Sequence, residues 1–265
     1  MMKKYFVIGN PIDHSLSPKL HNYWLKENKI DATYDKIKID ERGLKIIISK
    51  IKERKINGIN VTVPFKKAVI PYLDKLSPEA EQTHSVNTII LDNKDLIGYN
   101  TDIGGFANAI KNLQFNIIGK KVFILGAGGV VPSIIFALNK MEVSEIIIAN
   151  RTKEKAEYLK NQFPNTSVID WGEVIDFDVV INATSLGLNK EEINLDFSKL
   201  EKNKLFYDVI YNPSETNFLK EGKKLGNQIE NGKLMFIYQA QEAFKIWHGI
   251  KPKINQKTLK LLEND

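Results

Sequence analysis

The sequence predicts an α/β protein, in which an N-terminal α/β domain is joined to a doubly wound domain with a parallel sheet. Strand-like and helix-like patterns alternate along the chain, which is typical of that class. Four short apolar runs in the second half have the character of strands buried on both faces of a parallel sheet: KVFIL, EIIIA, DVVIN and LFYDVI. The glycine cluster GAGG lies between the first of these runs and an apolar helix pattern.

The first half alternates less regularly, and its spacing predicts each element in turn. Residues 5–9 form an apolar strand, and PKLHNYWLKENK has the spacing of a helix. TYDKIKI alternates as a strand, ERGLKIIISKIKERK is a second helix, and INGINVTVPF is a strand that Pro64 ends. A helix over residues 66–75, a helical turn from Pro78 and a hairpin over DNKD complete this half.

The domain boundary is placed near residue 102, where the strand character changes without a flexible linker. We expect one domain over residues 1–102, completed by C-terminal helices within 236–265, and a second over 103–235. The uncharged stretch 122–138 is slightly too short to span a bilayer and is broken by GAGG and Pro132. It is better explained as a strand, a glycine turn and a buried helix.

Composition excludes several classes of function. With 265 residues, 43% hydrophobic and 26% charged, the chain is an ordinary globular protein and not a disordered one. It has no cysteine, which excludes disulfides, thiolate nucleophiles and cysteine-zinc sites. Its four histidines lack the close pairing of metal sites, so we expect no metal. The N-terminus has no signal-peptide pattern, and a cytoplasmic location is expected.

The net charge of +6 raises the question of a nucleic-acid partner. Only three residues are arginine, and the lysines are scattered rather than gathered in a basic patch with interleaved aromatics. We therefore expect a solvated lysine surface, a small-molecule ligand, and neither nucleic acid nor membrane as partner. The sequence leaves open whether the protein is a monomer or a homodimer.

The glycine cluster indicates a dinucleotide site. Gly126, Gly128 and Gly129 lie where glycines let a backbone approach a pyrophosphate at a helix N-terminus. Val131 stands at the third glycine position of the usual G-x-G-x-x-G pattern, and a tight turn without a ligand is the alternative. After the next strand the chain reads NRT, with Arg151 where an NAD site usually has an acid, which predicts NADP over NAD.

The segment HSLSP has a structural and a functional interpretation. Ser17 can cap a helix that Pro18 begins, but capping does not explain Ser15. Two hydroxyls that converge beside a helix N-terminus can instead donate to a carboxylate or a phosphate.

Two further fragments carry polar residues that apolar strands do not require. In NVTVPFK, the side chains of Asn60 and Thr62 share one face, and Lys66 follows. In SVNTIILDNKDLIGYNTD, Asn87 opens a hairpin whose return strand leads to Asp102. Each has a structural alternative: a surface lysine, a turn residue and a helix N-cap.

Eight motifs in order resemble those of the shikimate dehydrogenase family over nearly the whole chain: GNPIDHSLSP, NVTVPFK, VNT, GYNTD, GAGG, NRT, NATS and MFIYQAQEAF. The resemblance implies a substrate-binding domain and a Rossmann-like NADP-binding domain. It implies NADPH-dependent, reversible reduction of 3-dehydroshikimate to shikimate in aromatic amino-acid (chorismate) biosynthesis.

The resemblance also implies roles for individual residues. Ser15 and Ser17 would hold the substrate carboxylate with Tyr211 facing that end, and Lys66 would exchange a proton with the reacting oxygen. The groups around the ring hydroxyls would be Thr62, Asn87, Asp102 and Gln239. The cofactor would be bound by Gly126, Ala127, Gly128, Gly129, Val130, Asn150, Arg151, Thr152 and Lys155, with Val209 and Gly232 near the nicotinamide.

The resemblance leaves some points open. Lys66 is favoured over Asp102 as the principal acid or base, because a cation can stabilise and protonate the developing oxyanion. Val130, Val131 and Pro132 replace the small or polar residues usual after GAGG, and Val209 stands where methionine is common. Two alternatives are a quinate/shikimate dehydrogenase with broader substrate and cofactor use, and an inactive relative that binds the metabolite as a regulator.

Overall fold

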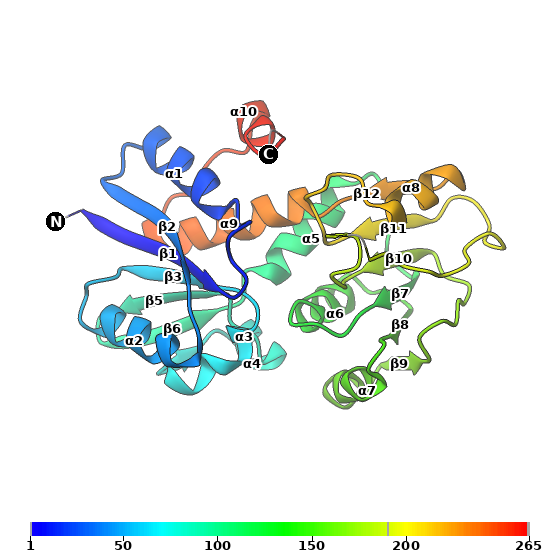
Figure 1. Ribbon diagram of the computed structural model, residues 1–265, viewed down its shortest axis with the longest axis horizontal. Helices are drawn as coiled ribbons and strands as arrows, with labels where there is room; N and C mark the ends of the chain where they lie inside the picture. The colour runs from blue at the N-terminus through cyan, green and yellow to red at the C-terminus, as the bar shows by residue number, and fades with distance from the viewer. Residues whose placement is uncertain (1, 190, 264–265) are drawn as a thin grey trace. The chain divides into compact units, whose positions relative to one another are not determined.

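The computed structural model describes residues 2–189 and 191–263. The chain forms two compact units, the first of Met1–Gly105 with Ile237–Asp265 and the second of Phe106–Phe236 (Figure 1). Within the described residues, no helix has the length and apolar character needed to cross a membrane.

The first unit contains a mixed six-stranded sheet in the order β2-β1-β3-β5-β6-β4. Strand β1 pairs in parallel with β2 and β3, whereas β5 pairs antiparallel with β3 and β6. The strands are β1 (Lys3–Gly9), β2 (Ala32–Lys38), β3 (Gly58–Val61), β4 (Lys75–Leu76), β5 (Thr88–Asp92) and β6 (Asp95–Tyr99).

Helices of the first unit follow from capping and apolar spacing. In α2, the Asp40 side chain accepts the Gly43 N–H at 2.8 Å, and apolar residues three and four apart bury one face against the sheet. The helices are α1 (Ser17–Glu27), α2 (Glu41–Lys52), α3 (Phe65–Ala68), the 3₁₀ turn η1 (Ile70–Tyr72), α4 (Pro78–Thr83), α9 (Lys233–His248) and α10 (Gln256–Lys260).

The second unit contains a six-stranded, all-parallel sheet in the order β12-β11-β10-β7-β8-β9. Counted from β7, this is the doubly wound order 3-2-1-4-5-6, whose reversal point lies between β7 and β10. The strands are β7 (Lys121–Leu125), β8 (Glu145–Ala149), β9 (Thr166–Ile169), β10 (Val179–Asn182), β11 (Leu205–Asp208) and β12 (Gln228–Glu230).

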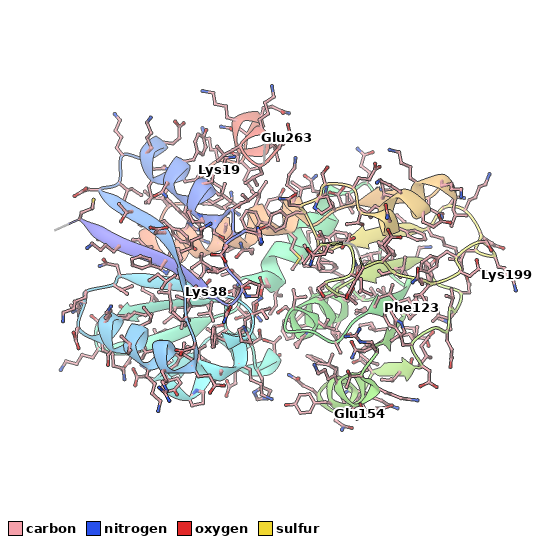
Figure 2. All side chains as sticks on the ribbon, viewed as in Figure 1. Lys19, Lys38, Phe123, Glu154, Lys199 and Glu263 are labelled. Atoms are coloured by element: carbon pink, nitrogen blue, oxygen red, sulfur yellow. The ribbon has the colours of Figure 1, made fainter. Side chains whose placement is uncertain are left out.

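Helices α5 (Asp102–Asn112), α6 (Val131–Lys140), α7 (Lys153–Gln162) and α8 (Asn217–Lys224) accompany this sheet, with α7 against β9 and α8 against β11 (Figure 1). The division between the units falls inside α5 and inside α9. Phe123 is fully buried in a cluster with other phenylalanines, whereas Glu154 and Lys199 extend from the surface (Figure 2).

Two local expectations are wrong. The helix expected over 66–75 ends at Ala68 and gives way to a 3₁₀ turn, and Leu73 is extended, because Pro71 cannot continue an α-helix. The expectation that the Ser17 side chain caps α1 is also wrong. Ser17 is the first helical residue and its side chain makes no cap bond, while the Ser15 hydroxyl oxygen accepts the Ser17 N–H at 3.3 Å.

Candidate active site

Lys66 and Asp102 form a close ion pair in the first unit. The Lys66 Nζ lies 2.6 Å from Asp102 Oδ2, and the two side chains are 13% and 9% exposed. Lys66 lies in the one-turn helix α3, which begins four residues after the end of β3, and Asp102 is the first residue of α5. The pair thus places an ammonium and a carboxylate at the edge of the protein interior, where electrostatic interactions exceed those in water.

Asn87 holds the other oxygen of this carboxylate. Its Nδ2 donates to Asp102 Oδ1 at 2.9 Å, and its Oδ1 accepts the Thr101 N–H at 2.8 Å, which fixes the orientation of the amide. Asn100 Oδ1 accepts the Asp102 N–H at 3.1 Å. The structure therefore brings together Lys66, Asn87 and Asp102, which are far apart in sequence.

The other predicted substrate-binding residues of the first unit lie at or next to α1, β3 and α9. Ser15 is half-buried just before α1, and Ser17 is 7% exposed at its start. Thr62 follows β3 and is tied to β1 through its N–H, which donates to Ile8 O at 2.9 Å. Gln239 is half-buried on α9.

Sequence reasoning missed part of the buried polar network behind these groups. The Tyr34 phenol donates to Asn60 Oδ1 at 2.6 Å, and Asn60 Nδ2 donates to Thr88 Oγ1 at 2.9 Å. The one-face pattern of NVTVPFK pointed to Asn60, although it was not chosen as a site residue. No sequence signal pointed to Tyr34, because it lies in a strand of ordinary alternation.

The glycine turn of the second unit lies at the reversal point of the sheet, after β7. Gly126 has φ +111°, and a Cβ there would lie 2.9 Å from the Ala183 carbonyl oxygen, so a side chain is excluded. Apart from Gly129 itself and its two chain neighbours, no heavy atom of the described residues lies within 4 Å of the position where Gly129 would carry a Cβ. The Ala127 N–H donates to Asn150 Oδ1 at 3.0 Å. The backbone is thus open at the place where a pyrophosphate fits.

Cationic side chains follow β8. Arg151 and Lys155 are exposed and have no ion-pair partner among the described residues, whereas Lys153 pairs with Asp170 at 2.7 Å. Asn150 Nδ2 donates to Thr152 O at 2.7 Å, which shapes the turn. Arg151 and Lys155 thus offer two cations just after β8, where the ribose 2′-phosphate of NADP would lie in a fold of this type. These side chains therefore fit the phosphorylated dinucleotide that the sequence predicts.

Val209 and Gly232 are in direct contact. A Cβ on Gly232 would lie 2.1 Å from the Val209 carbonyl oxygen, and the Gly232 N–H donates to Ile210 O at 3.0 Å. Tyr211, two residues beyond Val209, stacks on Phe236 with ring centroids 4.6 Å apart.

The buried carboxylate of Asp208 fixes the backbone that leads to Val209 and Tyr211. Asp208 accepts hydrogen bonds from Thr216 Oγ1 at 2.6 Å, Asn182 Nδ2 at 3.0 Å and the Ile210 N–H at 3.0 Å. Burial raises the pKa of the Asp208 carboxyl to about 6, against the effect of these hydrogen bonds.

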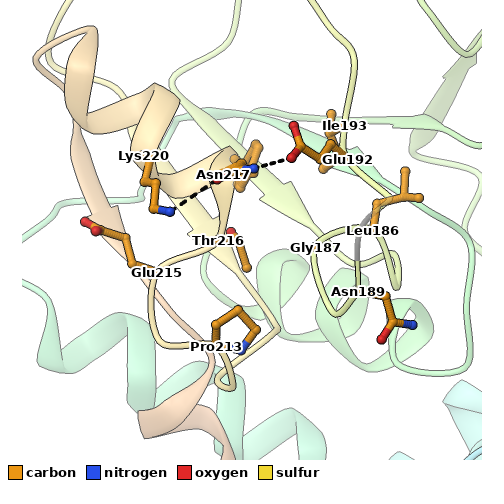
Figure 3. Close-up of a pocket in the computed structure, with 11 residues that line it drawn as sticks. Leu186, Gly187, Asn189, Glu192, Ile193, Pro213, Glu215, Thr216, Asn217 and Lys220 are labelled. Atoms are coloured by element: carbon orange, nitrogen blue, oxygen red, sulfur yellow. Dashed lines mark hydrogen bonds between the residues drawn. The ribbon is translucent and has the colours of Figure 1, made fainter.

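A pocket of about 190 Å³ also opens in the second unit, with residues 186–189 and 192–193 on one side and residues 213–220 on the other (Figure 3). Asn217 connects its sides, since its amide donates to Glu192 and its oxygen accepts from Lys220 Nζ (Figure 3). Among the residues described, none of the predicted site residues lines it. The site expected from the sequence and this pocket are therefore different places.

The fold and the site define the class of the protein. It is an oxidoreductase, with a Rossmann-type sheet whose glycine turn suits a dinucleotide and an α/β unit that carries a lysine–carboxylate pair. The family model for the shikimate dehydrogenase substrate binding domain matches residues 7–89, and the model for shikimate / quinate 5-dehydrogenase matches residues 107–213.

Individual relatives agree with these matches. The chain is 56% identical over 264 residues to the shikimate dehydrogenase (NADP(+)) of Pelagibacter ubique, covering 99% of this chain and 100% of the relative. The crystal structure of shikimate dehydrogenase from Aquifex aeolicus matches with a TM-score of 0.91 at 36% identity, covering 100% and 98% of the two chains. The Thermus thermophilus enzyme in complex with NADP(H) and shikimate matches with a TM-score of 0.89 at 29% identity, covering 99% and 97%. The chain belongs to the shikimate dehydrogenase family.

Proposed function

We propose that the protein catalyses the reversible, NADPH-dependent reduction of 3-dehydroshikimate to shikimate. The observation that carries this proposal is the Lys66–Asp102 pair at 2.6 Å, in a chain whose 56% identical relative is named shikimate dehydrogenase (NADP(+)). Among the related solved structures, one shikimate dehydrogenase is in complex with NADP+ and another is in complex with NADP(H) and shikimate. The product would serve chorismate and aromatic amino-acid biosynthesis.

The substrate would be held by residues 1–102 and the helices within 236–265. Ser15 and Ser17 would donate to its carboxylate, as hydroxyls beside a helix N-terminus can. Tyr211 would face the same end. The ring hydroxyls would contact Thr62, Asn87, Asp102 and Gln239, side chains that offer both donors and acceptors.

Lys66 would give the proton. When bound, NADPH supplies the hydride, and negative charge develops on the ketone oxygen as the hydride arrives. The Lys66 ammonium would stabilise this charge and donate a proton to the same oxygen. Asp102 would orient Lys66 and accept from a ring hydroxyl, while Asn87 keeps the carboxylate in place at 2.9 Å. In the reverse direction, Lys66 would take up the hydroxyl proton.

NADP would be bound by residues 103–235. The turn Gly126–Val130 would hold the pyrophosphate, since its glycines leave the backbone open. Arg151, Thr152 and Lys155 would contact the 2′-phosphate, with Asn150 shaping their turn. Val209 and Gly232 would lie beside the nicotinamide, where their close backbone contact leaves no room for a side chain at position 232.

The test is to follow NADPH absorbance in the presence of 3-dehydroshikimate. Turnover that depends on this ketone is expected, and a folded protein without turnover would overturn the proposal and favour a binding role. Quinate with NAD forms the second arm, because the matching family model covers shikimate and quinate enzymes alike. Quinate oxidation at a rate close to that of shikimate would identify the broader enzyme instead.

A further inference from the structure

A continuous chain of buried hydrogen bonds runs through the first unit, from the start of α1 to the Lys66–Asp102 pair. The Ser17 side chain bonds to the Tyr34 phenol, which donates to Asn60 Oδ1 at 2.6 Å. Asn60 Nδ2 donates to the Asn87 backbone oxygen at 3.0 Å. Asn87 then donates to Asp102 Oδ1 at 2.9 Å.

The direction of each bond in this chain is determined by chemistry. A backbone carbonyl can only accept, so the Asn60 amide nitrogen must face Asn87 O, and Asn60 Oδ1 is left as an acceptor. The Tyr34 phenol has one hydroxyl proton, and it donates this proton to Asn60 Oδ1. The bond between Ser17 and Tyr34 therefore runs from the serine hydroxyl to the phenol oxygen.

Tyr34 is held rigidly. Its ring stacks on His21 with centroids 4.2 Å apart and planes 3° from parallel. Its backbone N–H donates to Asn22 Oδ1 at 3.0 Å, and its carbonyl accepts from Asn22 Nδ2 at 2.7 Å. The side chain is 3% exposed, and burial raises the pKa of the phenol well above its usual range, so the group keeps its proton.

We propose that Tyr34 is a positioning residue that couples the two ends of the substrate site, Ser17 at the carboxylate end and Asn60 behind the Lys66–Asp102 pair. This inference rests on the proposed function. A fixed phenol holds the serine hydroxyl in one rotamer and the amide in one orientation, so both ends of the substrate meet side chains already in place. Such preorganisation lowers the cost of reaching the reactive geometry.

The test compares Tyr34→Phe with Tyr5→Phe. Both tyrosines are 3% exposed, and both rings contact Trp247, with centroids 6.0 and 5.0 Å away. Tyr5 takes no part in the chain, so its variant measures the effect of removing a phenol oxygen from the same aromatic cluster. We expect Tyr34→Phe to lower kcat/KM for shikimate about tenfold, equivalent to about 1.4 kcal/mol. We expect KM for NADP+ to stay unchanged, and Tyr5→Phe to stay within about twofold of wild type.

Equal kinetics for the two variants would overturn the role of Tyr34, whatever their melting temperatures. If Tyr34→Phe does not fold, Thr88→Val removes a second link, which joins the Asn60 side chain to the Asn87 side chain that holds Asp102. The Thr88 hydroxyl accepts from Asn60 at 2.9 Å and donates to Asn87 Oδ1 at 3.1 Å. The same selective loss of kcat/KM is expected, and wild-type kinetics would contradict the coupling. Absence of turnover in the wild type would instead refute the proposed function, so the two failures are distinguishable.

Discussion

Replacing Lys66 by alanine tests the proposed chemistry most directly. The ammonium lies 2.6 Å from Asp102 Oδ2, and both side chains are largely buried at 13% and 9% exposure. If Lys66 protonates the developing oxyanion, its loss should lower kcat by about 10²- to 10⁴-fold. This corresponds to about 3 to 5 kcal/mol of activation free energy.

The same substitution has a second, separable effect on stability. Without Lys66, the Asp102 carboxylate keeps the Asn87 amide but loses its cation. Breaking a fully buried pair costs about 3 to 5 kcal/mol, and this pair is partly accessible to water, so we expect a loss at or below the lower end. Thermal unfolding measures this cost, and NADPH absorbance with 3-dehydroshikimate measures kcat on the folded fraction.

Lys67→Ala is the matched control, because Lys67 is the exposed neighbour on the same helical turn. It should leave kcat within about twofold of wild type. Asp102→Asn, alone and with Lys66→Ala, completes the comparison, and the double variant should lose little more than Lys66→Ala alone, since contacting residues are not additive. A kcat for Lys66→Ala within about fivefold of wild type would refute the assignment of the proton donor.

Three further predictions concern the cofactor turn, backbone packing and pH. Arg151→Ala should raise KM for NADPH about 10- to 100-fold, as expected for a lost charge-assisted hydrogen bond, while Lys153→Ala, whose charge is already paired, should change it little. Gly232→Ala should destabilise the protein by about 1 to 3 kcal/mol, since its Cβ would lie 2.1 Å from a backbone oxygen, while Gly129→Ala, with nothing within 4 Å, should not. Burial lowers the pKa of His21 from 6.5 to about 3. The unfolded chain therefore binds this proton first, and His21 makes the unfolding free energy fall as pH drops from about 6.5 to about 3. His21→Phe should remove this contribution, as measured by urea unfolding across that range.

Each of these predictions has a contrary result. If Arg151→Ala raised KM for NADPH and KM for NADH equally, the arginine would not bind the 2′-phosphate. Equal melting temperatures for the two glycine variants would mean that the chain around Gly232 moves freely. Parallel pH curves for wild type and His21→Phe would show that the imidazole is protonated as easily in the folded protein as in the unfolded one.

Strands and helices with strong apolar periodicity could be predicted from the sequence. The four buried strands of the second unit, the DNKD hairpin and the long C-terminal helix all occur as expected. The short strands β4, β9 and β12 were missed, because two to four residues carry too little periodicity and their polar side chains suit edge positions. Their place depends on partner strands, which sequence spacing does not describe.

The sequence by itself determined the kinds of chemistry available to this protein. The glycine turn with Arg151 beyond it predicts a dinucleotide site, and the resemblance of the motifs around Lys66 to the family implies a proton-transfer site. These signals are local, since each depends on residues close together in the chain.

Only the tertiary structure decided which of these groups act together. Lys66 and Asp102 meet across 36 positions of sequence, and Tyr34 meets Asn60 across 26, because strand pairing in the sheet brings distant segments side by side. The two serines of HSLSP show the same limit. The hydroxyl of Ser15 takes the backbone N–H and that of Ser17 faces Tyr34, the reverse of the capping expected from sequence. The partner of a side chain is a property of the packed molecule, and local pattern cannot supply it.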